Sequence, residues 1–378
     1  MAELLLHIGM PKTGTTAIQH FLSANTSQLR THRVVYDQYR GADKCHDFLV
    51  HWVHKGQWGE VEAFLDQLLT EEAHTVILSC GRLFAFSSRM ATRKRDLVLV
   101  ESHWETEQKA IHQLLDILQK RFSKIRIAVF LRRQDLALES AFNQAVKKGS
   151  WRGEDIAEFL SYAHCRFDYA RILKMWSDSL SPQNLHIGVY ERDKFVNHDI
   201  RYEFLKLLDL SDETFTFESK TKHAENIRLP REILEYKAIL NRIEKPRSRE
   251  FIFRRALRQI AHDMALDSTR WQNFLTSEQR KQLLLDFSEG NRWVAELSGK
   301  SSPLFDESDI TNHQDEGDYP GLAVETAVEI YLRLSAILKT PHYRRLIRQK
   351  KFQEFRASIP LIGTVRKKLS RLLRKVSR

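Results

Sequence analysis

Residues that could bind an anion are concentrated in one short segment near the start of the chain. Residues 4–22 read LLLHIGMPKTGTTAIQHFL, an aliphatic run followed by Lys12, three threonines and two glycines. A strand that ends in such a turn and continues as a helix directs backbone N–H groups and a positive helix end at one point. Lys12 adds a full positive charge, and Thr13, Thr15 and Thr16 add hydroxyl groups. The segment therefore predicts a site for a phosphate or sulfonate group.

The spacing of this loop differs from that of two common nucleotide-binding motifs. In the ATP- and GTP-binding pattern G-x-x-x-x-G-K-[ST], the lysine follows the second glycine. Here Lys12 precedes Gly14 by two residues, and the dinucleotide pattern G-x-G-x-x-G is absent. A nucleotide kinase is therefore an alternative, but the position of Lys12 argues against it. A plain glycine turn with a surface lysine is the purely structural alternative.

The segment PKTGTT resembles the 5′-phosphosulfate loop of the sulfotransferases that use 3′-phosphoadenosine 5′-phosphosulfate (PAPS). The usual pattern in that family is P-K-[ST]-G-T-[TS], directly after the first strand. Each position is matched here, by Pro11, Lys12, Thr13, Gly14, Thr15 and Thr16. The resemblance implies PAPS as the donor and these six residues as its binding loop. We expect no metal ion, because no histidine pair, cysteine pair or acidic triplet lies near the loop.

A second motif of that family is an arginine at the end of a strand with a serine eight residues later, both of which hold the 3′-phosphate. Here the apolar run 125–131 is followed by Arg132, and Ser140 lies eight residues on. Arg132 would lie at the carboxyl end of a parallel strand, where open α/β sheets bind ligands. A guanidinium can bind a phosphate through two contacts. Arg133 is a neighbouring candidate, with its side chain on the opposite face.

The resemblance also implies a division of catalytic work. Sulfuryl transfer depends on positioning and charge stabilisation, by analogy with phosphoryl transfer. Lys12 is expected to neutralise charge at the oxygen that bridges sulfate and phosphate. The acceptor hydroxyl also needs a base. Many bacterial relatives carry a glutamate in a Ser-Ser-Glu-like motif after the second strand, but residues 79–82 of this chain read SCGR.

Four residues are candidates for the missing base. His46 and His51 follow the first predicted helix, and Glu101 and His103 lie in a predicted loop before the run 125–131. Histidine is suited to proton transfer near neutral pH. We place His46 first and Glu101 second. Because the glutamate is missing, a non-catalytic, membrane-docked binding protein that retains the donor loop is a further alternative.

The elements that position these residues follow from hydrophobic patterning. Apolar runs of 5–7 residues predict strands buried on both faces, at residues 3–8, 75–79, 125–131 and 185–190. Helical patterns separate them, at residues 15–24, 108–122 and 136–147. This alternation predicts an α/β fold with a P-loop-like parallel sheet flanked by helices. Helical patterns then dominate, at residues 200–208, 230–243, 249–264, 277–297 and 322–338.

Charge is distributed unevenly along the chain. Residues 341–378 contain thirteen Lys and Arg and one acid, so they account for the net charge of +11, and the rest is close to neutral. We therefore expect no nucleic-acid partner. Leucines lie between these basic residues at helical spacing, which is typical of a helix attracted to anionic lipid. A disordered solubilising tail is the alternative. Residues 303–320 carry six acids without Lys or Arg and are predicted to form a loop.

Three segments are expected along the 378 residues: a sulfotransferase domain at 1–300, an acidic loop with a packing helix at 301–340, and a basic amphipathic tail at 341–378. A hydrophobic fraction of 42% and a charged fraction of 29% exclude a disordered, collagen-like or membrane-bundle protein. Three widely spaced cysteines and no visible leader favour the cytoplasm, with a peripheral position on the inner membrane face as an option. The expected acceptor is a hydroxyl of a glycan or glycolipid.

Overall fold

The structure is a computed structural model. It describes residues 1–37, 45–69, 73–86, 101–217, 229–243, 250–266, 273–300, 303–311 and 319–358, with the backbone alone at 101–102, 162, 311 and 350–358. The chain forms two compact units. The first comprises Met1–Ala141, Asp155–Asn226 and Asn273–Glu316, and the second Phe142–Glu154, Ile227–Gln272 and Gly317–Arg378. These units interleave along the chain, so they do not coincide with the three consecutive segments expected from the sequence.

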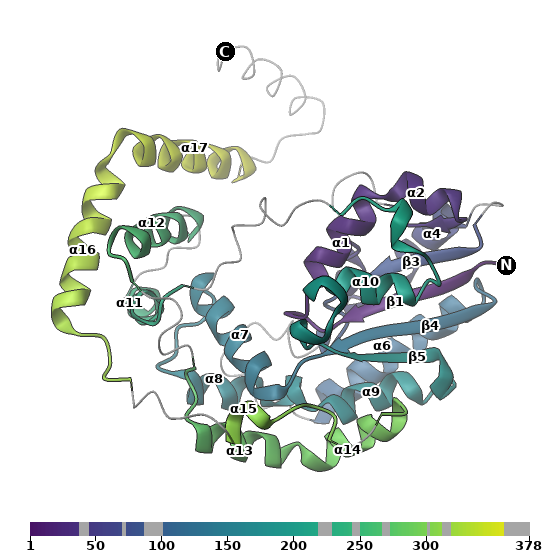
Figure 1. Ribbon diagram of the computed structural model, residues 1–378. Coiled ribbons are helices and arrows are strands. Elements are labelled where there is room, and N and C mark those ends of the chain that lie inside the picture. The colour runs from purple at the N-terminus through teal and green to yellow at the C-terminus, as the bar shows by residue number, and fades with distance from the viewer. Residues whose placement is uncertain are drawn as a thin grey trace. The chain divides into compact units, whose positions relative to one another are not determined.

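A parallel sheet of five strands organises the first unit (Figure 1). Its strands are β1 Glu3–Gly9, β2 Val34–Val35, β3 Thr75–Ser79, β4 Lys124–Leu131 and β5 Leu185–Val189. Their order is β2-β3-β1-β4-β5, with every neighbouring pair parallel. The chain first builds the side of β1 that holds β3 and β2, and then crosses to the side that holds β4 and β5. This reversal creates a topological switch point at the carboxyl ends of β1 and β4.

Helices cover both faces of the sheet. Those of the first unit are α1 Thr15–Ala24, α2 Thr26–Thr31, α3 Phe48–His54, α4 Trp58–Leu68, α6 Glu101–Gln119, α7 Gln134–Lys147, α8 Ile156–Ala163, α9 Tyr169–Ser177, α10 Ile200–Lys206, α13 Ser277–Asp286, α14 Ser288–Leu297 and α15 Ser308–Thr311. Helix α7 continues past Ala141 into the second unit. Figure 1 shows α1 and α10 on one face of the sheet, with α6 and α9 on the other.

Buried apolar side chains fix the start of α1 relative to the sheet. Helix α1 places Ile18, Phe21 and Leu22 on one stripe, and all three are buried. They belong to a core cluster that also contains Leu5, Ile77, Ala128, Phe130, Ile200 and Phe204. Because this cluster joins β1, β3 and β4 to α1 and α10, the loop between β1 and α1 is anchored at both ends.

The second unit contains four helices in its described residues: α11 Arg231–Ile243, α12 Glu250–Asp263, α16 Val324–Lys339 and α17 Pro341–Ser358. Its interior holds a buried ion pair between Lys237 Nζ and Glu250, at 3.0 Å. Lys237 also donates a hydrogen bond to Asn241, whose Nδ2 donates to the carbonyl of Val146 at 2.9 Å. These contacts join α11, α12 and the end of α7 within this unit.

The predicted α/β fold with a mainly helical C-terminal half is confirmed. The short strand β2 was missed, because two valines are too few to produce a recognisable pattern. The predicted helix at 277–297 is divided at Phe287 into α13 and α14. The acidic segment contains the short helix α15, and residues 359–378 of the basic tail lie outside the described residues. No helix among the described residues is long and apolar enough to cross a membrane.

Candidate functional site

The loop between β1 and α1 is connected to both neighbouring strands. Met10 donates its amide N–H to the carbonyl of Phe130 on β4 at 3.1 Å. On the other side, the amide of Cys80 after β3 donates to the carbonyl of His7 at 2.9 Å. Within the loop, the buried Thr13 hydroxyl donates to the carbonyl of Met10 at 2.6 Å. Thr13 therefore braces the loop, whereas the sequence had assigned its hydroxyl to the ligand.

Backbone conformation explains the glycine at the start of α1. Lys12 and Gly14 both have a φ of +79°, in the left-handed region that favours glycine. A Cβ atom at Gly14 would lie 2.8 Å from Ile200 Cγ2, so a side chain there would also clash with α10. The amides of Thr15 and Thr16 follow at the helix start, where no intrahelical acceptor exists. The loop thus presents backbone N–H groups at a positive helix end, beside a half-buried Lys12.

Arg132 reaches this loop from the neighbouring strand. Its Nη1 donates to the carbonyl of Lys12 at 3.4 Å, and its guanidinium carbon lies 5.9 Å from the ring centre of Tyr190, which follows β5. Burial lowers the pKa of Arg132, and it forms no ion pair with a described carboxylate. The two predicted parts of the donor site, the loop and Arg132, therefore meet at the switch point between β1 and β4.

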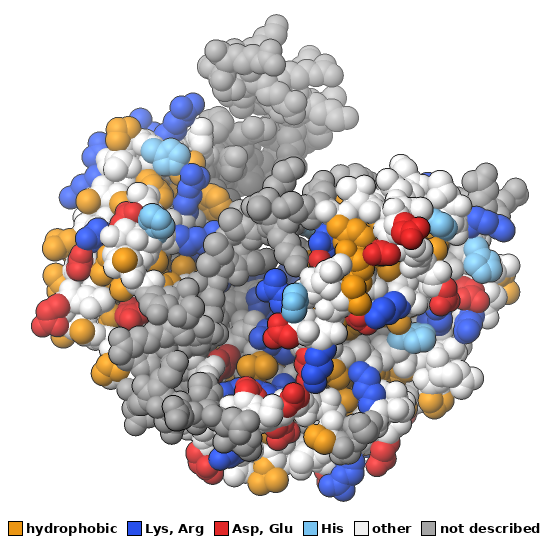
Figure 2. Space-filling view, in the orientation of Figure 1, with side chains coloured by type: hydrophobic (Ala, Val, Ile, Leu, Met, Phe, Trp, Pro, Cys, Tyr) orange, Lys and Arg blue, Asp and Glu red, His pale blue; other side chains and the backbone are white. Residues whose placement is uncertain are grey.

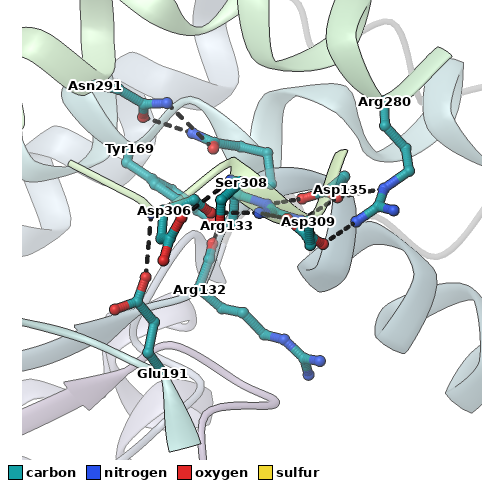
Figure 3. Close-up of polar contacts among 11 residues, drawn as sticks. Arg132, Arg133, Asp135, Tyr169, Glu191, Arg280, Asn291, Asp306, Ser308 and Asp309 are labelled. Atoms are coloured by element: carbon teal, nitrogen blue, oxygen red, sulfur yellow. Dashed lines mark hydrogen bonds and ion pairs between the residues drawn. The ribbon is translucent and has the colours of Figure 1, made fainter. Parts of the chain in front are cut away.

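The adjacent Arg133 points the other way and has a structural role. It is 5% exposed, with ion pairs to Asp135 at 2.8 Å and to Asp309 at 2.5 Å. Arg280 completes the group by contacting Asp135 at 2.7 Å and Asp309 at 3.0 Å. Burial alone would lower the pKa of Arg133, but these hydrogen bonds raise it. Figure 3 shows Arg132 extending away from this cluster. The candidate Arg133 is therefore occupied, and Arg132 is the cation available to a ligand.

Residues 303–311 form a strap that holds the backbone around Arg132. Arg133 donates to the carbonyl of Asp306, and the amide of Asp306 donates to Glu191 after β5 at 3.2 Å. The ring of Phe305 lies 6.3 Å from that of Tyr169, whose hydroxyl donates to the carbonyl of Arg132 at 2.6 Å. The strap thereby connects the ends of β4 and β5 close to the loop.

Ser140 is half-buried on α7, as its predicted place in the fold requires. It forms no hydrogen bond with any described residue, and no described contact joins it to Arg132. Its assignment to the 3′-phosphate stays a prediction.

The structure argues against His46 as the base. Its side chain is 1% exposed, Nε2 donates to the carbonyl of Asp37 at 2.8 Å, and Nδ1 accepts from the amide of Ser79 at 2.9 Å. Burial lowers its pKa to about 4 despite the hydrogen bond to Asp37. Both ring nitrogens are occupied by backbone groups, so His46 holds the end of β3 in place. Its sequence signal, a histidine after the first helix, did not reveal this role.

The other candidate bases lie on helices. His51 is exposed on α3. Glu101 and His103 occupy the first turn of α6, so the predicted loop before β4 is wrong at these two positions. Because α6 leads into the parallel strand β4, its first turn lies toward the carboxyl edge of the sheet, as does the donor loop. His103 Nδ1 is buried and has no partner among the described residues. The side chain of Glu101 lies outside the described part of the structure.

Several residues of the site were missed or underrated from the sequence. Tyr190 was predicted only as the last residue of a strand, although its ring lies beside both Gly14 and Arg132. Asp309 was assigned to a loop, although it balances two buried arginines. The sequence carried no signal for Asp309, because acidic side chains in a loop are usually solvated. The described residues contain no group of three His, Cys, Asp or Glu side chains that could hold a metal ion.

Comparisons with known proteins give a limited answer. No protein-family model matches the chain, and no solved structure matches it. An uncharacterized protein of Archaeoglobus fulgidus is 26% identical over 233 residues, which cover 56% of this chain. The chain spans about 57% of the length of that relative. The fold therefore defines an α/β protein with a parallel sheet, whose β1–α1 loop lies at the topological switch point.

Proposed function

We propose that this protein is a PAPS-dependent sulfotransferase that transfers a sulfuryl group to a hydroxyl of a glycan or glycolipid. The observation that carries the proposal is the contact between Arg132 and the carbonyl of Lys12. PAPS has anionic groups at both the 5′ and 3′ positions of one nucleoside, so its site needs two cationic parts close together. A loop that contains a lysine meets this requirement together with a strand-end arginine that has no ion pair to a carboxylate in the described part of the chain.

Each residue of the donor site has its own role in this proposal. PAPS, when bound, supplies the sulfuryl group, which passes to the acceptor oxygen as the bond to the 5′-phosphate breaks. The Thr15 and Thr16 amides bind the 5′-phosphosulfate, with Pro11 and Gly14 shaping the turn. Lys12 stabilises negative charge on the leaving phosphate oxygen, an electrostatic contact whose removal costs about 10²–10³ in rate elsewhere. Arg132 and Ser140 hold the 3′-phosphate.

The proton of the acceptor hydroxyl passes to a side chain at the same edge of the sheet. We assign this role to Glu101, with His103 beside it as the second candidate, because both belong to the first turn of α6. The cytoplasmic location is part of the proposal and is supported by three cysteines that form no disulfide with one another, Cys45, Cys80 and Cys165.

Isothermal titration with adenosine 3′,5′-bisphosphate tests the donor site directly. We expect binding by the full chain without magnesium, and its loss in both Lys12→Ala and Arg132→Ala. Arg292→Ala is the matched control, since Arg292 is exposed on α14. Binding that survives both site substitutions would refute the proposal. Binding of ATP with magnesium, and not of the bisphosphate, would favour a kinase.

Turnover separates an enzyme from a binding protein that has kept the donor loop. The chain should transfer labelled sulfate from PAPS to a pool of extracted glycans and glycolipids, and Lys12→Ala should abolish the transfer. Bisphosphate binding without transfer to any acceptor would favour the non-catalytic alternative.

A further inference from the structure

Helix α16 in the second unit exposes an apolar stripe on the side opposite its packed face. Ile330 and Leu334 are buried, and α16 packs on α11 and α12. Four large apolar side chains lie on the opposite side and are 51–72% exposed: Val324, Val328, Tyr331 and Leu332. Their spacing of four, three and one residues places them on one face of the helix. An exposed apolar stripe of this kind is typical of a surface that contacts a second molecule.

The next helix carries positive charge. Helix α17 follows α16 after Thr340, and its described arginines Arg344, Arg345 and Arg348 are all exposed. In Figure 2, Lys and Arg side chains gather at the place of α17, and hydrophobic side chains follow the outer edge along α16. The sequence adds ten more Lys and Arg after Arg348, with one acid. Apolar and cationic groups are thus neighbours on the same unit.

We propose that the outer face of α16 and the arginines of α17 form a docking surface for an anionic phospholipid bilayer. An apolar stripe beside cationic residues is the composition that binds a membrane interface. Charge favours lipid over a second copy of the chain, because pairing this face with itself would bring two strongly basic segments together. Glu325 and Glu329 border the stripe, and Glu329 is paired with Arg333 at 2.6 Å. The surface shares no residue with the donor site. The membrane-docking proposal can therefore be tested independently of the proposed sulfotransferase activity.

Vesicle sedimentation of the full chain tests this surface. We expect binding to phosphatidylcholine vesicles that contain phosphatidylglycerol, and much weaker binding to phosphatidylcholine alone. Replacing Arg344, Arg345 and Arg348 by Gln should weaken partitioning by about fivefold for each arginine, as expected for about 1 kcal/mol per basic residue. Val328→Ser with Leu332→Ser should weaken it by at least about tenfold, from the lost apolar contact.

Matched controls come from the first unit, where Leu285 is 64% exposed and Lys281 is exposed. Leu285→Ser and Lys281→Gln should leave sedimentation unchanged. Unaltered sedimentation in the α16 and α17 variants would overturn the proposal. A dimeric mass in light scattering that the α16 substitutions abolish would instead assign the stripe to a second copy. Deletion of residues 359–378 could also strengthen vesicle binding. That result would show that the chain's own tail covers the apolar stripe.

Discussion

Acid should destabilise this protein through two buried histidines that contact Ser79, the last residue of β3. His46 is held by backbone groups, and the buried His7 contacts Ser79 Oγ through Nδ1 at 2.9 Å. Burial lowers the pKa of each to about 4, from an ordinary value of 6.5. The unfolded chain therefore binds protons between these two values while the folded chain does not. The free energy of unfolding is unaffected above about pH 6.5 and falls as the pH drops toward 4.

The magnitude follows from linkage. With a pKa of 6.5 in the unfolded state and about 4 in the folded state, each histidine lowers the free energy of unfolding by about 2 kcal/mol at about pH 5. Two independent histidines would give about 4 kcal/mol, a large part of the stability of an ordinary domain. Urea unfolding followed by tryptophan fluorescence at about pH 7.5 and about pH 5 measures this difference.

Replacing one histidine measures its own contribution to the stability that is lost on acidification. His46→Gln should be less stable than the parent at neutral pH, because the hydrogen bonds are imperfectly replaced, but should lose about 2 kcal/mol less on acidification. The exposed His51→Gln is the control and should behave as the parent does. An unchanged acid-induced loss in His46→Gln would refute the reasoning. Loss of sulfate transfer in folded His46→Gln at neutral pH would restore His46 as the base.

Two further substitutions test the geometry around the donor loop. Gly14→Ala should abolish bisphosphate binding and lower the melting temperature, because of the positive φ and the contact with Ile200. Gly59→Ala on α4 meets no atom within 4 Å, so it should leave binding unchanged and should not lower the melting temperature. Asp309→Asn should weaken bisphosphate binding and cost about 1–3 kcal/mol in unfolding, because Arg133 and Arg280 then share one carboxylate. Partial recovery in Asp309→Glu is expected, and equal affinity in all three chains would show that the strap does not position Arg132.

Local patterns were sufficient to predict the four longer strands and the helix at 15–24, because apolar periodicity records burial directly. They also marked Arg132, since a strand of known direction fixes which edge its last residue occupies. The roles of Arg132 and Arg133 could not be separated in this way. Their difference depends on Asp309 and Arg280, which lie more than a hundred residues further along the chain. The burial of His46 could not be predicted for a related reason, because its partners are backbone groups that carry no sequence signature.

The strap has a consequence for synthesis of the chain. A chain that ends before residue 303 lacks Asp309, so Arg133 and Arg280 would share one carboxylate, Asp135. A nascent or prematurely terminated chain that ends before the strap should remain open at the carboxyl ends of β4 and β5. Truncation before the strap should therefore lower the stability of the first unit more than the loss of nine exposed loop residues would.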